Sequence, residues 1–169
     1  MSLLMFLYIR KHEFCSENFK DEGGSLKLEY PKDITDFIPN LKYISISRDT
    51  DYKVGYWEKA NHIHNWLIKN CATRDRFDKP IDDCRPIEIP IEKLEKLLSA
   101  CKEVLENHSL AKSLLPTKNG FDFGSTKYGE WYFDDIKATI KIIEPIVEFM
   151  KNKEENEDYT WTVIYHANW

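Results

Sequence analysis

The stretch YTWTVIYH, residues 159–166, places Trp161, Val163 and Tyr165 at every second position near the end of the chain. Successive side chains of a β-strand point to opposite faces of a sheet, so this spacing predicts a half-buried strand. The preceding residues 130–151 instead repeat apolar side chains every three or four positions, which predicts an amphipathic helix. A long helix that leads into a closing strand indicates a fold in which helices cover one face of a sheet.

The same two periods predict the remaining elements of the fold. Strands are expected at residues 3–10, 41–48, 87–89 and 121–124, and helices at residues 56–70 and 90–107, with a short helix between Ser109 and Pro116. Pro145 lies inside the last helix and is expected to kink it, because its ring clashes with the carbonyl group one turn earlier. The order of these elements predicts an α+β fold: a mainly antiparallel sheet with three main helices packed on it and a strand at each end.

The chain length of 169 residues matches one average domain, since two halves would be too small to bury good cores. Residues 11–40 are polar and contain a Gly-Gly pair and two prolines, which predicts a long loop that is mobile or lid-like. Residues 72–86 predict a second, charged loop. We therefore expect a single domain, residues 1–169, with two long connections.

The charge balance argues against two classes of partner. The formal net charge is -5 and the pI is near 5.6, whereas non-specific binding of nucleic acids or anionic membranes needs clustered Lys and Arg. Residues 3–9 are apolar without a preceding basic segment and predict a buried strand, and no segment approaches the ~20 apolar residues of a membrane span. The four cysteines form no CxxC pair, so we expect reduced thiols in a soluble, cytoplasmic protein.

The segment WEKANHIHNW, residues 57–66, is the richest in chemical groups. On the expected helix, Glu58, His62 and Trp66 are four residues apart and share one face. His62 could contact a ligand or act as an acid or base, since imidazole titrates near neutral pH; alternatively it is a half-exposed histidine with a surface hydrogen bond. His62 and His64 point to different sides of a helix, so they cannot hold one metal ion together.

Two further segments carry candidate polar groups. Asp82 and Asp83 precede Cys84 in a loop, where two carboxylates suit a divalent cation or sugar hydroxyl groups, or are simply solvated loop charge. The segment FDFGSTK, residues 121–127, lacks the spacing of a phosphate-binding loop, but a Gly-Ser-Thr turn before a helix presents N–H and hydroxyl groups to an anion. Alternatively, residues 121–127 form an ordinary turn with Ser and Thr hydroxyl groups as caps.

Several motifs together resemble a family of small uncharacterised bacteriophage and prophage proteins. They are MSLLMFLY (1–8), GYWEKANHIH (55–64), DDC (82–84), LLPT (114–117), GFDFGST (120–126) and EWYF (130–133). The family often has glycine after DDC, where this chain has Arg85 and Pro86, so a tight turn is not expected there. The resemblance implies a phage or mobile-element origin and action in the cytoplasm. Small phage proteins of this kind often act against host defence by binding a host protein or sequestering a nucleotide signal.

The leading hypothesis is a non-enzymatic protein that binds a small anionic, nucleotide-like ligand, with no cofactor and no metal. Aromatic residues make up 14% of the chain, more than one small core needs, so some rings are expected to stack on a base while lysines meet phosphate. The candidate ligand-binding residues are Trp57, Lys59, His62, Trp66, Asp82, Asp83, Phe123, Ser125, Thr126, Tyr128 and Trp131, with Lys127 as a further phosphate contact.

Two alternatives stay open beside ligand binding. The first is a protein-interaction module that inhibits a host protein through exposed Trp and Tyr side chains. The second is a hydrolase, metal-independent or using a divalent metal, with Asp82, Asp83 and His62 at its centre. The surplus of aromatic side chains is also compatible with a homo-oligomer.

Overall fold

The computed structural model describes residues 2–15, 46–153 and 159–169. In this described part, the sheet consists of strands β1 (Leu4–Cys15), β2 (Ile46–Glu58), β3 (Ile87–Glu88) and β4 (Tyr159–Asn168). All neighbouring strands are antiparallel in the order β2-β1-β4-β3, so the first and last strands lie side by side at its centre. The α+β fold with an antiparallel sheet and terminal strands is confirmed.

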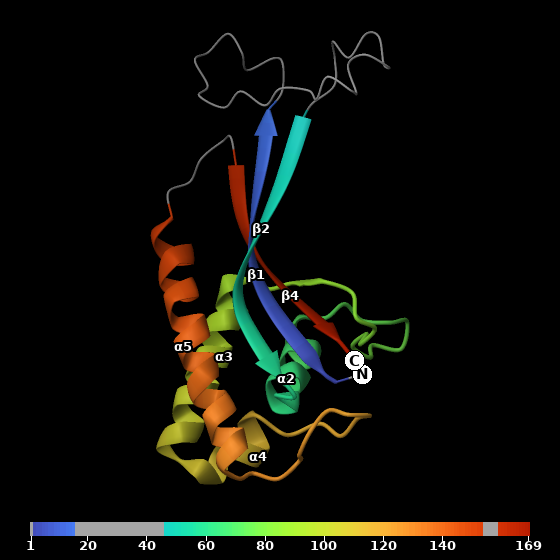
Figure 1. Ribbon diagram of the computed structural model, residues 1–169, viewed down its shortest axis with the longest axis vertical. Coiled ribbons are helices and arrows are strands. Elements are labelled where there is room, and N and C mark those ends of the chain that lie inside the picture. Colours follow the sequence, from blue (N-terminus) through green and yellow to red (C-terminus); the bar gives the residue numbers. More distant parts are fainter. Residues whose placement is uncertain (1, 16–45, 154–158) are drawn as a thin grey trace.

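Three long helices accompany the sheet: α2 (Asn61–Cys71), α3 (Ile91–Glu106) and α5 (Glu130–Asn152). A 3₁₀ turn (His108–Leu110) and the short helix α4 (Ala111–Leu114) follow α3. Helices α3 and α5 pack side by side, and α5 also contacts β2 (Figure 1). Helix α2 follows the end of β2 and lies at the lower end of the sheet in Figure 1. None of the helices in the described residues is long and apolar enough to cross a membrane.

The core forms where the inward-facing side chains of the sheet meet α3 and α5. Leu3, just before β1, and Met5 and Leu7 within it are fully buried at every second position, as strand periodicity requires. A Cβ atom at Gly55 in β2 would lie 2.6 Å from Ile142 of α5, so the absence of a side chain lets that helix approach the sheet closely. This close packing fixes the middle of α5 against the end of β2.

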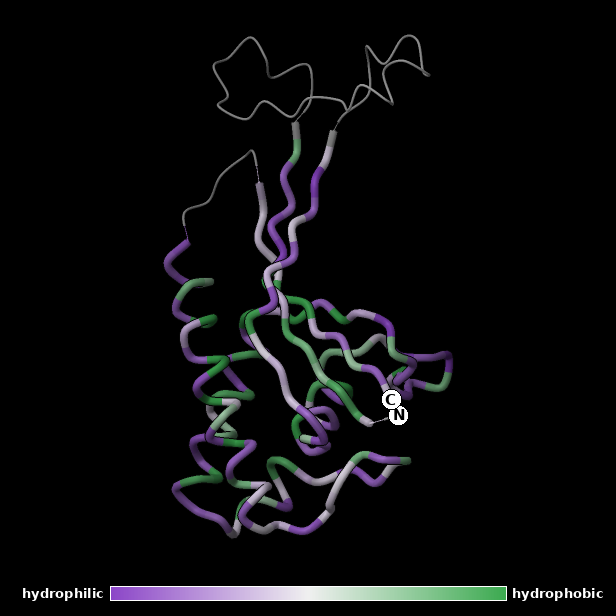
Figure 2. The backbone as a smooth tube through the Cα atoms, viewed as in Figure 1, coloured by the Kyte–Doolittle hydropathy of each residue, from purple (hydrophilic) through white to green (hydrophobic). Residues whose placement is uncertain are grey.

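β1 and β2 extend well beyond the helices as a twisted two-stranded ribbon, joined along part of its length by the start of β4 (Figure 1). The chain is hydrophilic along this extension, in contrast to the apolar part of β1 that the helices cover (Figure 2). Arg10 donates two hydrogen bonds to the carboxylate of Asp51, at 2.7 and 2.8 Å, and His12 contacts Asp49 at 2.5 Å. The extension is therefore held by cross-strand polar pairs rather than by a core.

The structure corrects the predicted start of the second helix. The helix expected at residues 56–70 begins at Asn61, because β2 pairs with β1 as far as Glu58. Lys59 then adopts a left-handed conformation (φ 60°) that separates strand from helix. The expected common helical face of Glu58, His62 and Trp66 is therefore wrong. Non-local pairing overrode a helical period that local sequence alone suggested.

Other boundaries differ in smaller ways. Residues 121–124 form a turn and no strand, since Asp122 and Gly124 both have positive φ angles. The expected long loop at residues 11–40 begins later, because residues 11–15 belong to β1; residues 16–40 lie outside the described residues. Of the expected strand 41–48, residues 41–45 also lie outside the described residues. Helices α3 and α5 and strand β4 match their predicted spans to within two residues, and Pro145 lies inside α5.

Candidate functional site

A pocket of about 480 Å³ opens where β2 ends and where α2 and α5 both begin. Its walls come from three parts of the chain: the end of β2 with the first turn of α2, the loop before α5, and the first two turns of α5. The lining residues are Glu58, Lys59, His62, Gly124, Ser125, Lys127, Gly129, Trp131, Tyr132 and Asp135. Its size suits a ligand of the size of a mononucleotide.

Two helix N-termini meet at this pocket. Helix α5 starts after Gly129, and helix α2 starts after Ala60; neither start has a side-chain cap. The first intrahelical backbone bond at the start of α5 runs from the N–H of Phe133 to the carbonyl of Gly129. The N–H groups of the three preceding residues are thus left for an external acceptor, and the helix dipole makes this end attractive to an anion.

His62 lies at the floor of the pocket and is only 2% exposed. Its ring packs against that of Tyr132 with a centroid distance of 4.2 Å, and its Nε2 atom has no hydrogen-bond partner among the described residues. Burial lowers the pKa of His62 to about 3, so the imidazole is neutral at physiological pH. The expectation of a half-exposed histidine with a surface hydrogen bond is wrong: the ring is buried, and it lines the pocket.

Asp135 is the second unusual group. It follows Trp131 by one turn on α5, so the carboxylate and the indole share one face of the helix. Burial, and then the neighbouring charge of Asp134, raise the pKa of Asp135 to about 6. In the part of the chain that the structure describes, no side chain or backbone group donates a hydrogen bond to this carboxylate. A half-buried carboxylate without donors is costly to the fold, and such groups gather at functional sites.

The loop before α5 is held in place by Asn61 at the start of α2. The amide of Asn61 donates to the carbonyl groups of Phe123 (3.1 Å) and Ser125 (2.9 Å). Gly124 has a φ of 90°, and a Cβ atom there would lie 2.8 Å from that of Lys59. Glycine is therefore needed for the loop to pass this close to the end of β2.

Two lysines stand at the pocket. Lys59 forms an exposed ion pair with Asp122 at 3.4 Å, whereas Lys127 has no ion pair within the described ranges. The backbone N–H of Lys127 donates to the hydroxyl of Ser125 at 3.1 Å, which orders the loop just before the helix. Lys127 thus lies three residues before the uncapped start of α5 and lines the same pocket.

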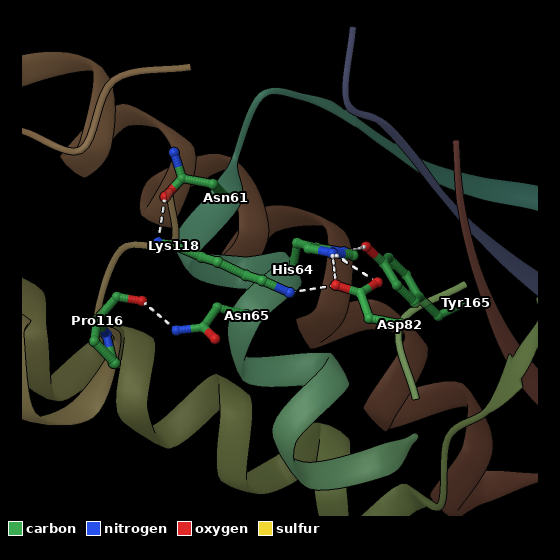
Figure 3. A network of polar contacts seen from close by, with 7 residues as sticks. All are labelled: Asn61, His64, Asn65, Asp82, Pro116, Lys118 and Tyr165. Carbon is green, nitrogen blue, oxygen red and sulfur yellow. Dashed lines mark hydrogen bonds and ion pairs between the residues drawn. The ribbon is translucent and has the colours of Figure 1, made fainter. Parts of the chain in front are cut away.

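A separate polar cluster lies on the other side of α2 (Figure 3). His64 contacts the hydroxyl of Tyr165 through Nδ1 (2.7 Å) and both carboxylate oxygens of Asp82 through Nε2 (3.2 and 3.3 Å), and Lys118 donates to the same carboxylate. Burial acts to raise the pKa of Asp82, but the hydrogen bonds from His64 and Lys118 outweigh it and keep that pKa below its usual range. Burial raises the pKa of Tyr165 far above its usual value, so its hydroxyl stays protonated.

This cluster fastens two loops to the fold. Asp82 belongs to the charged loop 72–86 and Lys118 to the loop before α5, while His64 and Tyr165 come from α2 and β4. The cavity beside it, about 10 Å³, has room for little more than one water molecule. We therefore interpret the cluster as structural.

The structure brings some of the candidate residues together and separates others. Lys59, His62, Ser125 and Trp131 line the one pocket. Trp57 and Phe123 are buried in the core, Trp66 is half-buried against it, Tyr128 packs on Tyr132 at 4.9 Å, and Thr126 is exposed. Asp82 belongs to the cluster with His64, and exposed Asp83 pairs with Arg85.

Sequence reasoning missed two pocket residues, Asp135 and Gly129, whereas Tyr132 was weighed with Tyr128 and Trp131 as a ring that stacks on a base or packs on the sheet. The spacing of Trp131 and Asp135 is a signal that both lie on one helical face, but it does not show what that face meets. Within the described residues, no group of three His, Cys, Asp or Glu side chains converges as metal ligands, and Cys71, Cys84 and Cys101 are free thiols.

Comparison of the chain with protein-family models, curated proteins and solved structures gave no match. The resemblance to small phage proteins therefore remains a prediction from the motifs.

Proposed function

We propose that this protein binds a small anionic, nucleotide-like ligand in the pocket between the starts of α2 and α5, without transforming it. The observation that carries the proposal is His62: a 2% exposed side chain that lines the pocket and whose buried Nε2 atom has no partner among the described residues. A buried polar group without a partner costs stability, and a ligand that bonds to it removes that cost.

The anionic part of the ligand would bind at the start of α5. Three backbone N–H groups, the positive end of the helix dipole and the Lys127 ammonium group all favour negative charge there. Phosphate needs several such donors at once. The space around Gly129 is open, since a Cβ atom there would meet nothing within 4 Å, so a phosphate group has room to approach the backbone.

The ring of the ligand would lie against Trp131. This indole is 83% exposed although it lines the pocket, so one of its faces is available for stacking. Stacking on an aromatic side chain contributes ~1–3 kcal/mol per base. Roughly micromolar binding needs about 8 kcal/mol, so the phosphate contacts would have to contribute the larger share.

The residues of the hydrolase hypothesis do not come together as a catalytic centre. A base that works near neutral pH needs a pKa near 7, whereas burial lowers that of His62 to about 3. The hydrolase hypothesis needs Asp82 and Asp83 beside His62, but Asp82 bonds to His64 and Lys118, and Asp83 to Arg85. A phage-encoded protein with such a pocket would act in the host cytoplasm by withholding a nucleotide signal.

Isothermal titration calorimetry with nucleoside monophosphates, cyclic nucleotides and inorganic phosphate tests the proposal. We expect binding of a nucleotide that Trp131→Ala weakens at least tenfold and that Phe77→Ala leaves unchanged. Phe77 is a matched control, because it is an exposed aromatic residue (65%) in the charged loop 72–86 and does not line the pocket. Absence of heat with every nucleotide, at concentrations up to the millimolar range, would refute ligand capture.

One observation favours a second function, inhibition of a host protein. Phe6 and Tyr56 lie next to each other (5.5 Å between ring centroids) on the sheet face that alternates with the buried residues, and Tyr56 is 48% exposed. Exposed aromatic rings are frequent hot spots of interfaces. A host protein whose capture is lost in Tyr56→Ala but kept in Trp131→Ala would support this function over ligand binding.

A further inference from the structure

We infer that the ligand of this pocket carries a guanine base, whose paired N–H donors bind the carboxylate of Asp135. This inference rests on the proposed function and names the ligand class. The pocket contains a negatively charged acceptor, the Asp135 carboxylate, as well as positive donors. An anionic group of the ligand would use the donors and leave this acceptor without a partner.

The carboxylate of Asp135 is positioned to read the edge of a stacked base. It lies one helical turn after Trp131 on the same face of α5, so a ring stacked on the indole has one edge toward Asp135. Within the described residues, neither an ion pair nor a hydrogen bond engages this carboxylate. Asp134, the preceding residue, differs: it is exposed and pairs with Lys137 at 2.9 Å.

The acceptor geometry selects among the common bases. A carboxylate presents two acceptor oxygens side by side, and guanine presents two adjacent donors, N1–H and the N2 amino group. Adenine and cytosine each place an acceptor nitrogen beside their amino group, and uracil flanks its one N–H with carbonyl groups. Of these bases, only guanine donates a hydrogen bond to each carboxylate oxygen. Each of the others would place an acceptor atom next to the negative charge.

The same carboxylate orients the ligand. Phosphate is repelled from Asp135 and from Glu58, which also lines the pocket, and is attracted to Lys127 and the start of α5. The neutral, buried His62 ring also lines the pocket and adds no charge to it. Base and phosphate are thus assigned to different ends of the pocket.

The test is calorimetry with the 5′-monophosphates of guanosine, inosine, xanthosine and adenosine on the full chain and on Asp135→Asn. For the wild type we expect guanosine monophosphate to bind at least tenfold more tightly than the inosine compound, which lacks the N2 amino group. Asp135→Asn should weaken the guanosine compound at least tenfold and strengthen the xanthosine compound, because its amide can donate to the C2 carbonyl group. Asp134→Asn makes the same charge change outside the pocket and should leave all four affinities unchanged.

The outcomes separate this inference from the proposed function. Equal binding of adenosine and guanosine monophosphates, or unchanged affinities in Asp135→Asn, overturns guanine recognition while the pocket remains a nucleotide site. Absence of binding by all four and by cyclic nucleotides overturns both. If Asp135→Asn fails to fold, the ranking of the four nucleotides on the wild type decides the question by itself.

Discussion

Replacing Asp135 by asparagine should make the protein more stable at neutral pH, although it damages the proposed site. The pKa of this carboxyl group rises from an ordinary 3.8 to about 6 in the folded protein, because burial and the charge of Asp134 disfavour ionisation. At about 1.36 kcal/mol per pH unit, this difference corresponds to a penalty of ~3 kcal/mol before solvent screening. Since the group is partly exposed, screening reduces the expected penalty to ~1 kcal/mol.

The pH dependence gives the prediction its sign. Between pH 3.8 and 6 the folded protein binds more protons at Asp135 than the unfolded chain does, so this residue makes stability fall as the pH rises through that window. The penalty is complete above pH 6 and absent below about pH 4. The stability gained by Asp135→Asn should therefore be near zero at pH 4 and reach ~1 kcal/mol at pH 7, where the melting temperature should rise by ~2–4 °C.

Urea unfolding of the wild type, Asp135→Asn and Asp134→Asn between pH 4 and 8, followed by circular dichroism, measures this difference. Taking the difference between variants cancels the titration of all other groups, including Asp82. Asp134→Asn removes an exposed charge and should change stability by less than ~0.5 kcal/mol. If Asp135→Asn is no more stable than the wild type at pH 7, or gains as much at pH 4 as at pH 7, then Asp135 is not the desolvated carboxylate that we describe.

Three other substitutions test the packing that holds the pocket. Asp82→Ala removes the acceptor of two part-buried donors and should destabilise the protein by about 2 kcal/mol in urea unfolding, whereas an unchanged midpoint would contradict the cluster's structural role. Gly55→Ala places a Cβ atom 2.6 Å from Ile142 and should cost ~1–3 kcal/mol, measured as a lower melting temperature; a neutral result would show that α5 can shift away. Trp57→Phe removes the 2.9 Å hydrogen bond to Thr139 and should cost about 1 kcal/mol by the same assay, with no loss expected in a Thr139→Val background.

Much of the fold follows from local periodicity. Helix α5 and strand β4 were predictable because their apolar residues face the core at the period of the element itself, as Ile136 and Val163 do. The start of α2 was not predictable, because it depends on how far β2 pairs with β1: Glu58 lies opposite Leu4, 54 positions away in sequence. The left-handed turn at Lys59 has no local signal either, since lysine has no preference for that conformation.

The candidate site was predictable only in part, for a related reason. His62 and Trp131 stood out because imidazole and indole are rare side chains with distinctive chemistry. Asp135 did not, because an aspartate in the second turn of a helix is ordinarily solvated, and only the tertiary fold places it in the pocket that His62 also lines. Conversely, Trp57 carries the same side chain as Trp131 but lies on the inward face of β2, where it packs in the core.

The strongest reason to regard the pocket as functional is the contrast with the other buried polar groups. Asn61, Asn65, His64 and Thr139 are each almost fully buried, and each makes at least one side-chain hydrogen bond: Asn61 to two loop carbonyls, Asn65 to the carbonyl of Pro116, His64 to Tyr165, and Thr139 to Trp57. The fold thus satisfies each of these four groups. Among the described residues, two buried side-chain atoms lack a partner: His62 Nε2, and Asp82 Oδ1 in the cluster with His64. His62 lines the pocket, and so does the half-buried Asp135, whose carboxylate accepts no hydrogen bond from the described residues. Both the buried His62 nitrogen and the Asp135 carboxylate reduce stability, and both lie at one pocket beside two uncapped helix starts. This is expected of a site that is optimised for a ligand and not for folding.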